Sequence, residues 1–298
     1  MPNSSFFRKK PSGFSMEIDD TMVSPFLYQP TPKGMRFLAA HYSAKYRIDL
    51  RCVDLRGKFE PDQTIIQYFR YIQTSDYLTS LEEGKTLGLV LSHGQQHAVP
   101  LLARKKDGKL DLVVFDSTSG ASVGAYFPIA ELFPEATFYL KSGTRQVDSN
   151  SCMTDAFCIL KEALQIDTLF DLLNAKKNEH HRAVSPIPPS GRRLLFERPA
   201  KPENFILFKM PERLLLTAQS SKFVTDADAD LAAILRGGRS LGEYRDHFRI
   251  SVSLTKGSEN YSTEINSYLF NKSREHKERF KLQDDFKKEL METVSSRL

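Results

Sequence analysis

The chain has 298 residues, 40% of them hydrophobic and 27% charged, and a net charge of +5. This composition is typical of a globular protein with one large domain or two modest ones, and the scattered basic residues argue against a nucleic-acid partner. The three cysteines contain no C-x-x-C pair, which argues against a disulfide framework or a zinc site, and no apolar run is long enough to span a membrane.

Residues 1–30 are rich in Ser, Pro and Lys and lack the apolar core of a secretory signal. We expect a flexible leader here, and a route independent of a signal peptide if the protein leaves its cell.

Residues 31–175 are expected to form the folded core. Apolar spacing predicts an amphipathic helix over 35–46, alternation predicts a strand over 48–53, and an aromatic-rich helix is expected over 63–80. The aromatic side chains of this last helix should pack it on a sheet.

A β-hairpin is predicted over 97–115, after a buried strand over 87–91 and a polar loop over 92–96. The Asp107-Gly108 pair marks its turn, since this dipeptide is a strong hairpin signal.

The hairpin should bring one histidine beside one acid. His97 opens the first strand and Asp116 follows the end of the second, and these two positions lie side by side in a hairpin. His93 falls where the preceding strand ends, and Asp111 lies nearer the turn. We therefore prefer His97 and Asp116 to these alternatives.

The chain after Asp116 is expected to return to the same place. The pattern predicts a loop over 117–124, a short helix over 128–133 and a strand over 136–140 that adds to the sheet.

A cysteine begins the next helix. Apolar residues at positions 153, 156, 157, 160 and 164 have helical spacing and predict one buried face, with Cys152 at the N-terminal end. The helix dipole and unpaired N–H groups there favour a thiolate, which is a nucleophile. Gln146, on the turn leading into the helix, can direct its side-chain N–H at an oxyanion. The competing interpretations are a buried structural thiol at Cys152 and a nucleophile at Cys158, which we place in the core.

The composition changes after this helix. A further helix is expected over 167–177, a polar, basic and proline-rich linker over 176–204, and a mostly helical C-terminal region over 205–298. The linker residues His180 and His181 have no further ligands nearby, so no metal site is expected.

Three local features are predicted within the C-terminal region. A helix after an Asp-rich turn should end at Leu235, a brief strand is expected over 251–254, and a charged helix is expected over 265–294.

Together these elements predict an α+β fold. A mixed or antiparallel sheet carrying His97 and Asp116 packs on the helix that begins with Cys152, and a helical extension follows. In this arrangement His97 would accept the thiol proton, Asp116 would orient the imidazole, and Cys152 would attack a carbonyl to form a thioester. The side chain of Gln146 and the N–H of Cys152 would hold the oxyanion.

The order of these residues resembles a known clan. A histidine opening a strand, an acid ending the next strand, and Gln-x-x-x-x-x-Cys at a helix start are similar to clan CE cysteine proteases, which include ubiquitin-like proteases, adenovirus protease and the YopJ family of bacterial effectors. The helix over 35–46 and the strand after it resemble the segment before the catalytic histidine in YopJ-like proteins. The resemblance covers the middle third of the chain and implies a catalytic triad of His97, Asp116 and Cys152.

The resemblance implies one of two reactions. A YopJ-like acetyltransferase would take its acetyl group from acetyl-coenzyme A, with inositol hexakisphosphate as cofactor, and modify Ser, Thr or Lys of a host protein such as a kinase. A thiol protease of the clan, such as a deubiquitinase, would need no cofactor and would hydrolyse the isopeptide bond of a ubiquitin-modified protein. A third hypothesis, a catalytically inactive binding module, predicts the loss of a catalytic residue, and none is missing.

Several residues bear on this choice. Ala98 follows His97 where ubiquitin-like proteases usually have tryptophan, the chain has no tryptophan, and it continues well past the cysteine helix, as YopJ-like proteins with a regulatory region do. The Gly108-Lys109 turn and the Phe115-Asp116 ending resemble the YopJ-family hairpin, although many members have glutamate at the acid position. The Asp116-Ser117 pair also resembles the Asp-Ser of ubiquitin-like proteases, which favours the protease. Met153 stands where both groups commonly have a small residue. The acetyltransferase is the preferred hypothesis.

A bound inositol hexakisphosphate would need several converging cations. The candidates are Lys176, Lys177, Arg182, Arg192, Arg193, Arg236 and Arg239. The resemblance also implies a virulence effector that is secreted into host cytoplasm without a signal peptide; otherwise a cytoplasmic protein is expected.

Overall fold

The computed structural model describes residues 7–8, 17–19, 29–30, 32–55, 65–93, 97–117, 123–147, 151–177, 201–235, 237–256, 259–276 and 278. The helices are α1 (Pro32–Tyr46), α2 (Ile65–Thr74), α3 (Asp76–Thr79), α4 (Phe127–Glu131), α5 (Cys152–Ala163), α6 (Leu169–Ala175), α7 (Ser221–Asp226) and α8 (Leu241–His247), with 3₁₀ turns η2 (Val123–Tyr126) and η3 (Glu212–Thr217) and a helix over 268–276. The strands are β1 (Phe7–Arg8), β2 (Glu17–Asp19), β3 (Gln29–Pro30), β4 (Asp49–Asp54), β5 (Thr86–His93), β6 (His97–Lys106), β7 (Lys109–Val114), β8 (Thr137–Lys141), β9 (Phe205–Phe208), β10 (Arg249–Lys256) and β11 (Glu259–Asn266).

The central sheet has six strands in the order β4-β5-β6-β7-β8-β9. β6 is antiparallel to both β5 and β7, whereas β4 pairs with β5, β7 with β8 and β8 with β9 in parallel. The fold is therefore α+β with a mixed sheet, as the sequence predicted.

The hairpin of β6 and β7 turns at the predicted dipeptide. Asp107 and Gly108 have φ values of 53° and 73°, the left-handed conformation that a type I′ hairpin turn requires at both positions. The ladder runs from the Lys106–Lys109 pair to the Leu101–Val114 pair, so the end of β7 lies near the start of β6.

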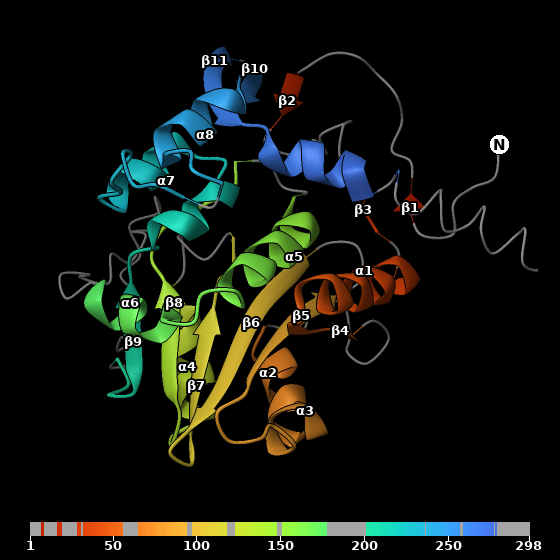
Figure 1. The fold of residues 1–298 in the computed structure, drawn as a ribbon, viewed down its shortest axis with the longest axis vertical. Coiled ribbons are helices and arrows are strands. Elements are labelled where there is room, and N and C mark those ends of the chain that lie inside the picture. Colours follow the sequence, from red (N-terminus) through yellow and green to blue (C-terminus); the bar gives the residue numbers. More distant parts are fainter. Residues whose placement is uncertain are drawn as a thin grey trace, which may run out of the picture.

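Successive side chains of the sheet enter two different cores, because neighbouring residues of a strand point to opposite faces. Leu102 and Val113 belong to the core that contains side chains of α1, α5, α6 and η3. Leu101 and Val114 belong to the core on the other face, with side chains of α2, α3 and α4. Figure 1 shows α1 and α5 beside each other on one side of the sheet.

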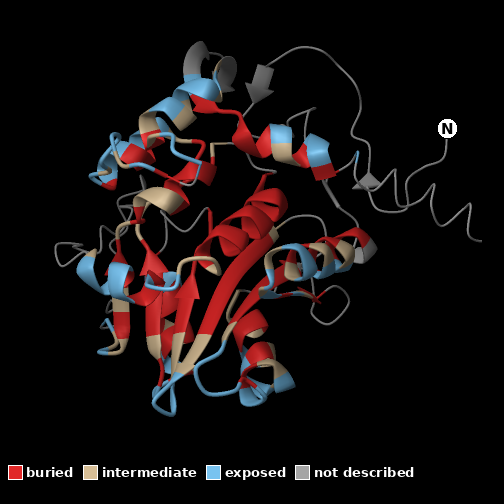
Figure 2. Ribbon diagram, viewed as in Figure 1, coloured by how far each residue is buried: buried red, intermediate tan, exposed pale blue. Residues whose placement is uncertain are grey.

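Helix α5 is buried along its whole length, as Figure 2 shows. It packs against β5 and β6 on one side and against α1 and η3 elsewhere, while Tyr268 and Leu269 cover Cys158. The sequence predicted only one buried face, which was incomplete, because elements distant in the chain cover the rest.

Among the buried residues, Lys161 and Glu162 form an ion pair of 2.6 Å, which offsets part of the cost of burying their charges.

The C-terminal part contains more strands than the sequence indicated. β9 pairs with β8 and completes the central sheet, and β10 and β11 form a hairpin. A short apolar run such as 205–208 has no periodicity that separates strand from helix. In Figure 1, α7, α8, β10 and β11 gather beyond one end of the sheet.

Three helix predictions differ from the structure in detail. The helix predicted to end at Leu235 is not formed, and the helix before the Asp-rich turn, α7, ends at Asp226. Leu235 donates its N–H to the carbonyl of Arg239. The loop between these two residues contains Gly237 and Gly238, both with positive φ. The aromatic helix over 63–80 divides into α2 and α3. Of the charged helix over 265–294, the described residues are helical over 268–276 and residues before that belong to β11.

Parts of the predicted domain organisation fall on residues that are not described. Within the leader over 1–30, β1 pairs with β3 and β2 pairs in parallel with β10. Residues 178–200 of the predicted linker lie outside the described residues. The leader and linker therefore stay predictions.

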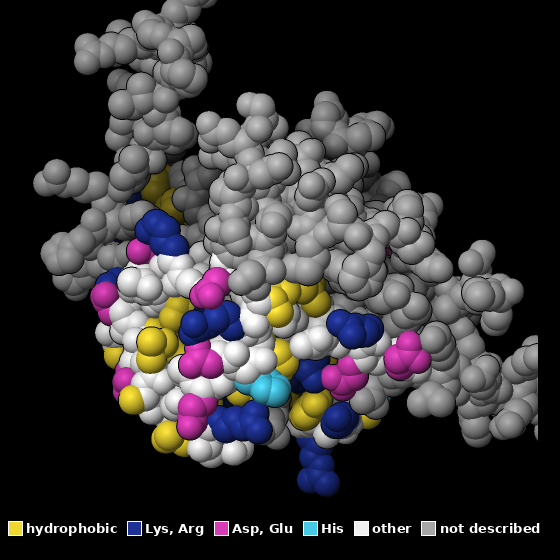
Figure 3. Space-filling view, turned by 90° about the horizontal axis from the view of Figure 1, so that it is seen from above, with side chains coloured by type: hydrophobic (Ala, Val, Ile, Leu, Met, Phe, Trp, Pro, Cys, Tyr) yellow, Lys and Arg dark blue, Asp and Glu magenta, His cyan; other side chains and the backbone are white. Residues whose placement is uncertain are grey.

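The surface has mixed charge on the face seen in Figure 3. There, basic and acidic side chains are interspersed over the described part. None of the described helices combines the length and hydropathy that crossing a membrane requires. Over the same ranges, no three His, Cys, Asp or Glu residues are grouped so that they could hold a metal ion.

Candidate active site

The β6–β7 hairpin brings His97 and Asp116 together. His97 is the first residue of β6, and Asp116 follows the last residue of β7 by two positions. The Nε2 atom of His97 lies 3.1 Å from Oδ1 of Asp116, with the two side chains 30% and 6% exposed. The neighbourhood that the hairpin register predicted is thus observed.

Tyr126 holds the other oxygen of this carboxylate. It is the last residue of η2, it is 2% exposed, and its hydroxyl donates a hydrogen bond to Oδ2 of Asp116. Burial, together with the charge of Asp116, raises the pKa of Tyr126 well above its ordinary value, so the phenol stays a donor. Asp116 is held from both sides.

Cys152 is the first residue of α5 and is 2% exposed. A hydrogen bond joins its side chain to that of His97. Burial alone would lower the pKa of His97, but hydrogen bonds to Asp116 and Cys152 and the charges of both raise it to about 10. At neutral pH the histidine is therefore protonated and places a positive charge beside the sulfur of Cys152.

Gln146 lies on the approach to α5 and is buried. The hydroxyl of Ser117 donates a hydrogen bond of 2.6 Å to Oε1 of Gln146, and the N–H of Gln146 donates to the carbonyl of Ser117 at 3.4 Å. Because the amide oxygen is occupied by Ser117, the orientation of the amide is fixed and its NH₂ group is the part that can donate to an oxyanion.

A buried ion pair lies one turn along α5 from Cys152. Arg145 and Asp155 bond to each other and are 1% and 2% exposed. Arg145 also donates to Oγ1 of Thr217 at 2.8 Å and to the carbonyl of Phe115 at 3.3 Å. It thus links the segment before Asp116, the cysteine helix and the C-terminal part.

Lys141, at the end of β8, is another buried charge. It is fully buried, and burial together with the nearby Arg145 lowers its pKa to about 7, against the opposing effect of Asp116 and Asp155. Its ammonium donates to the carbonyl of Gly143.

The alternative residues lie elsewhere. Asp111 pairs with Arg104 at 2.5 Å near the turn of the hairpin. Cys158 is fully buried, and this burial raises the pKa of its thiol to about 12. His93 pairs with His97 in the β5–β6 ladder, but its side chain, like His180 and His181, lies outside the described residues.

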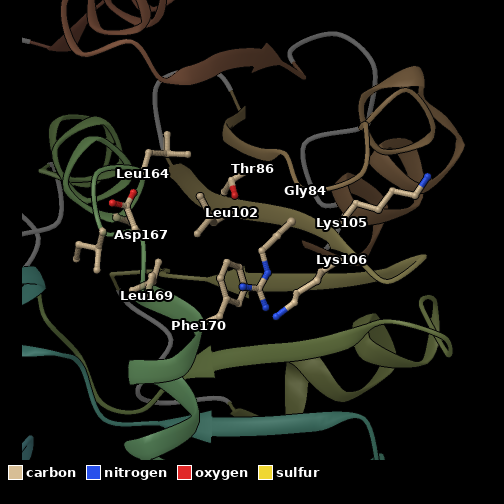
Figure 4. Close-up of a pocket in the computed structure, with 12 residues that line it drawn as sticks. Gly84, Thr86, Leu102, Lys105, Lys106, Leu164, Asp167, Leu169 and Phe170 are labelled. Carbon is tan, nitrogen blue, oxygen red and sulfur yellow. The ribbon is translucent and has the colours of Figure 1, made fainter.

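A cavity of about 380 Å³ lies at the opposite end of α5 from Cys152. Figure 4 shows Leu164, Leu169 and Phe170 on one side of it and residues of β6 on the other. Arg104 stacks on the ring of Phe170 with 3.6 Å between its guanidinium carbon and the ring centre. His97, Asp116 and Cys152 are not among the residues that line this cavity.

The basic candidates for a polyphosphate site are only partly described. Lys176 forms an ion pair of 2.5 Å with Glu212, Lys177 bridges to the backbone of Phe208, and Arg239 is exposed. Arg182, Arg192, Arg193 and Arg236 lie outside the described residues. Of these, Lys176 already has a carboxylate partner in Glu212.

Three residues of the site had no clear sequence signal. Tyr126 is one of 11 tyrosines, and nothing in its neighbours marks it. Ser117 adjoins Asp116, and in the sequence it indicates only a resemblance to the Asp-Ser of ubiquitin-like proteases. Gln219 stands far from the site in the chain, and its Oε1 accepts a hydrogen bond from the N–H of Val147, the residue after Gln146.

The sequence matches no protein-family model, and no curated protein matches it significantly. The fold, in contrast, is shared with solved structures. A deletion variant of AvrA with inositol hexakisphosphate (IP6) and CoA has 14% sequence identity and a TM-score of 0.53, and the alignment covers 83% of this chain and 86% of that chain. HopZ1a in complex with IP6 and CoA has 10% identity and a TM-score of 0.56, covering 83% and 82%. A second structure of HopZ1a, in complex with IP6, has 10% identity and a TM-score of 0.54, covering 83% of each chain.

These neighbours are effectors of the YopJ family. The chain therefore shares the fold of these effectors, the YopJ-like fold that the order of its histidine, acid and cysteine implied.

Proposed function

We propose that this chain is a cysteine-dependent acetyltransferase that transfers an acetyl group from acetyl-coenzyme A to Ser, Thr or Lys of a host protein. The observation that carries the proposal is the contact of His97 with both Asp116 and Cys152, in a fold shared with effectors whose structures contain CoA.

The chemistry follows from the positions of these groups. The sulfur of Cys152 attacks the acetyl carbonyl, the C–S bond of the donor breaks, and CoA leaves with a proton that His97 supplies. The side chain of Gln146 and the first N–H groups of α5 face the developing oxyanion. His97 then removes the proton of the acceptor as it attacks the thioester, and Asp116 keeps the imidazole oriented in both steps.

Inositol hexakisphosphate is proposed as a cofactor because the neighbours were crystallised with it. Such a ligand supplies concentrated negative charge that can order basic segments. Among the described residues, Lys176 and Lys177 are candidates for its binding site. Entry into host cytoplasm without a signal peptide, and a kinase as target, belong to the same proposal.

A ubiquitin-directed protease is the second candidate. It is favoured by the aspartate at position 116 followed by Ser117, whose hydroxyl holds the proposed oxyanion donor Gln146. The same triad would then transfer the acyl group to water.

Intact-protein mass spectrometry separates the two candidates. The protein and its Cys152→Ala variant are incubated with acetyl-coenzyme A and inositol hexakisphosphate, and separately with a ubiquitin propargylamide probe. Acetyl adducts that require Cys152 support the acetyltransferase. Capture of the probe without acetylation supports the protease instead, and no adduct in either reaction contradicts both.

A further inference from the structure

Gln219 connects the C-terminal part of the chain to the segment that carries the site. It lies between η3 and α7 and is fully buried. Its Oε1 accepts a hydrogen bond of 2.8 Å from the N–H of Val147, and its Nε2 donates one of 3.0 Å to Oγ of Ser151. One side chain thus bonds to both ends of residues 147–151.

The backbone around Gln219 strengthens this connection. The N–H groups of Gln219 and Ser220 donate to the carbonyl of Arg145 at 3.0 and 3.1 Å, and the carbonyl of Gln219 accepts from the N–H of Asn266 at 3.2 Å. The backbone N–H, the backbone carbonyl and both polar atoms of the side chain of Gln219 are therefore engaged. These hydrogen bonds fix the position of Gln219, so that its side chain can in turn fix the positions of Val147 and Ser151.

The bonded atoms flank the two groups that face the oxyanion. Arg145 and Val147 stand on either side of Gln146, and Ser151 directly precedes Cys152. The hydrogen bonds of Gln219 therefore set the spacing between the amide of Gln146 and the start of α5. An error of about 1 Å in such spacing is enough to cost roughly a hundredfold in rate.

Ser151 makes an unusual use of its hydroxyl. A serine that precedes a helix commonly accepts a hydrogen bond from an N–H of the first turn. The side chain of Ser151 makes no such cap, and its oxygen accepts from Gln219 instead. It consequently does not occupy the N–H groups at the start of α5, where an oxyanion would bind.

We propose that Gln219 is a positioning residue that holds Gln146 and the start of α5 in the geometry that stabilises the oxyanion. The C-terminal part of the chain thereby completes the acylation site from outside the core sheet. The inference rests on the proposed function only in that Cys152 must be acylated; it does not depend on which acyl donor is natural.

Two reagents separate oxyanion stabilisation from the reactivity of the thiol. The reaction with p-nitrophenyl acetate forms the C–S bond to Cys152, breaks the ester C–O bond and releases nitrophenolate, through a tetrahedral oxyanion. Iodoacetamide alkylates the same sulfur by direct displacement of iodide, without an oxyanion. The ratio of the two rate constants therefore reports on the oxyanion site, whereas a general loss of structure affects both reactions.

Gln219→Met keeps the length of the side chain and removes its hydrogen bonds. We expect the rate constant of the ester burst to fall roughly tenfold or more, while that of alkylation stays within about twofold. In a Gln146→Ala background the same substitution should have little further effect, since the residue that it positions is absent. If Gln219→Met does not fold, Ser151→Ala breaks one of the same hydrogen bonds from the other side.

Asn204→Leu is the matched control. The Nδ2 atom of Asn204 donates to the carbonyls of Ala130, Phe133 and Ala136 at 3.2, 3.0 and 2.9 Å, beside the start of β8 and away from Cys152. Asn204→Leu should leave the ratio of the two rate constants unchanged. Both this variant and Gln219→Met are assayed at a temperature below the midpoints of their thermal unfolding. A Gln219→Met protein with an unchanged ratio overturns the inference alone. Absence of any burst from the unsubstituted protein overturns the inference together with the proposed function.

Discussion

The hydroxyl of Tyr126 donates a hydrogen bond to Oδ2 of Asp116, while Oδ1 of the same carboxylate lies 3.1 Å from Nε2 of His97. One oxygen is thus anchored by a buried phenol, and the other is directed at the histidine. Tyr126, in η2, therefore acts on the orientation of His97 through Asp116.

Tyr126→Phe removes this anchor without opening a cavity. We expect the free energy of unfolding to fall by about 1 kcal/mol, the usual net contribution of one hydrogen bond. Acylation of Cys152 should slow by roughly tenfold or less, since Asp116 remains present but is less well oriented. Chemical denaturation and the ester burst measure the two effects, and an unchanged burst would show that Tyr126 has no positioning role.

Asp116→Asn should change the titration of His97. Hydrogen bonds and charge from Asp116 and Cys152 raise the pKa of His97 to about 10 against the effect of burial. Without the carboxylate, burial counts for more, so the pKa should fall towards or below the ordinary value of about 6.5. The measurement is NMR of the imidazole resonance over a pH series, and Asp111→Asn serves as the control.

The raised pKa of His97 also makes the unfolding free energy depend on pH. Because the pKa of His97 is higher in the folded than in the unfolded state, its contribution is fully present below pH of about 6.5 and is lost as the pH rises through about 10. The difference in unfolding free energy between the protein and His97→Gln should therefore shrink over this window. A difference that grows with pH would contradict the protonated histidine.

Replacing Arg145 tests the buried ion pair. Arg145→Met leaves Asp155 buried without its cation, which should cost about 3 to 5 kcal/mol of unfolding free energy. Oδ1 of Asp155 and Nε of Arg145 have no hydrogen-bond partner among the described residues, so the pair is imperfectly satisfied. The double variant Arg145→Met/Asp155→Leu should regain most of the loss. Urea denaturation measures the unfolding free energies of these variants. If the double variant loses as much unfolding free energy as the two single substitutions together, Arg145 and Asp155 are not coupled.

The two cysteines of α5 should react very differently. Cys152 contacts a protonated His97, whereas Cys158 is fully buried and its pKa is raised to about 12. Brief treatment of the native protein with iodoacetamide should modify Cys152 and spare Cys158. Peptide mass spectrometry locates the label. Preferential modification of Cys158 would contradict the assignment of Cys152 as the nucleophile.

The local features that the sequence predicts well are those set by neighbouring residues. The Asp107-Gly108 turn fixes the register of the hairpin and with it the meeting of His97 and Asp116. Helical spacing fixes the start of α5 and the position of Cys152. Both depend on a few adjacent side chains, which periodicity can detect.

The features that the sequence does not predict depend on contacts between residues that are distant in the chain. Tyr126 and Gln219 reach the site only because η2 and the segment after η3 fold back onto it. The complete burial of α5 and the pairing of β9 with β8 have the same origin. No local pattern encodes which segment covers a helix or extends a sheet, and tertiary packing decides both.

The central claim, that Cys152 carries the acyl group, is tested most directly by locating the thioester. The protein is incubated with acetyl-coenzyme A and inositol hexakisphosphate, quenched in acid and digested, with Cys152→Ala and the matched variant Cys158→Ala treated in parallel. The account predicts a hydroxylamine-labile acetyl group on the peptide that contains Cys152, present in Cys158→Ala and absent from Cys152→Ala. An acetyl group that persists in Cys152→Ala, or a thioester on Cys158, would contradict it.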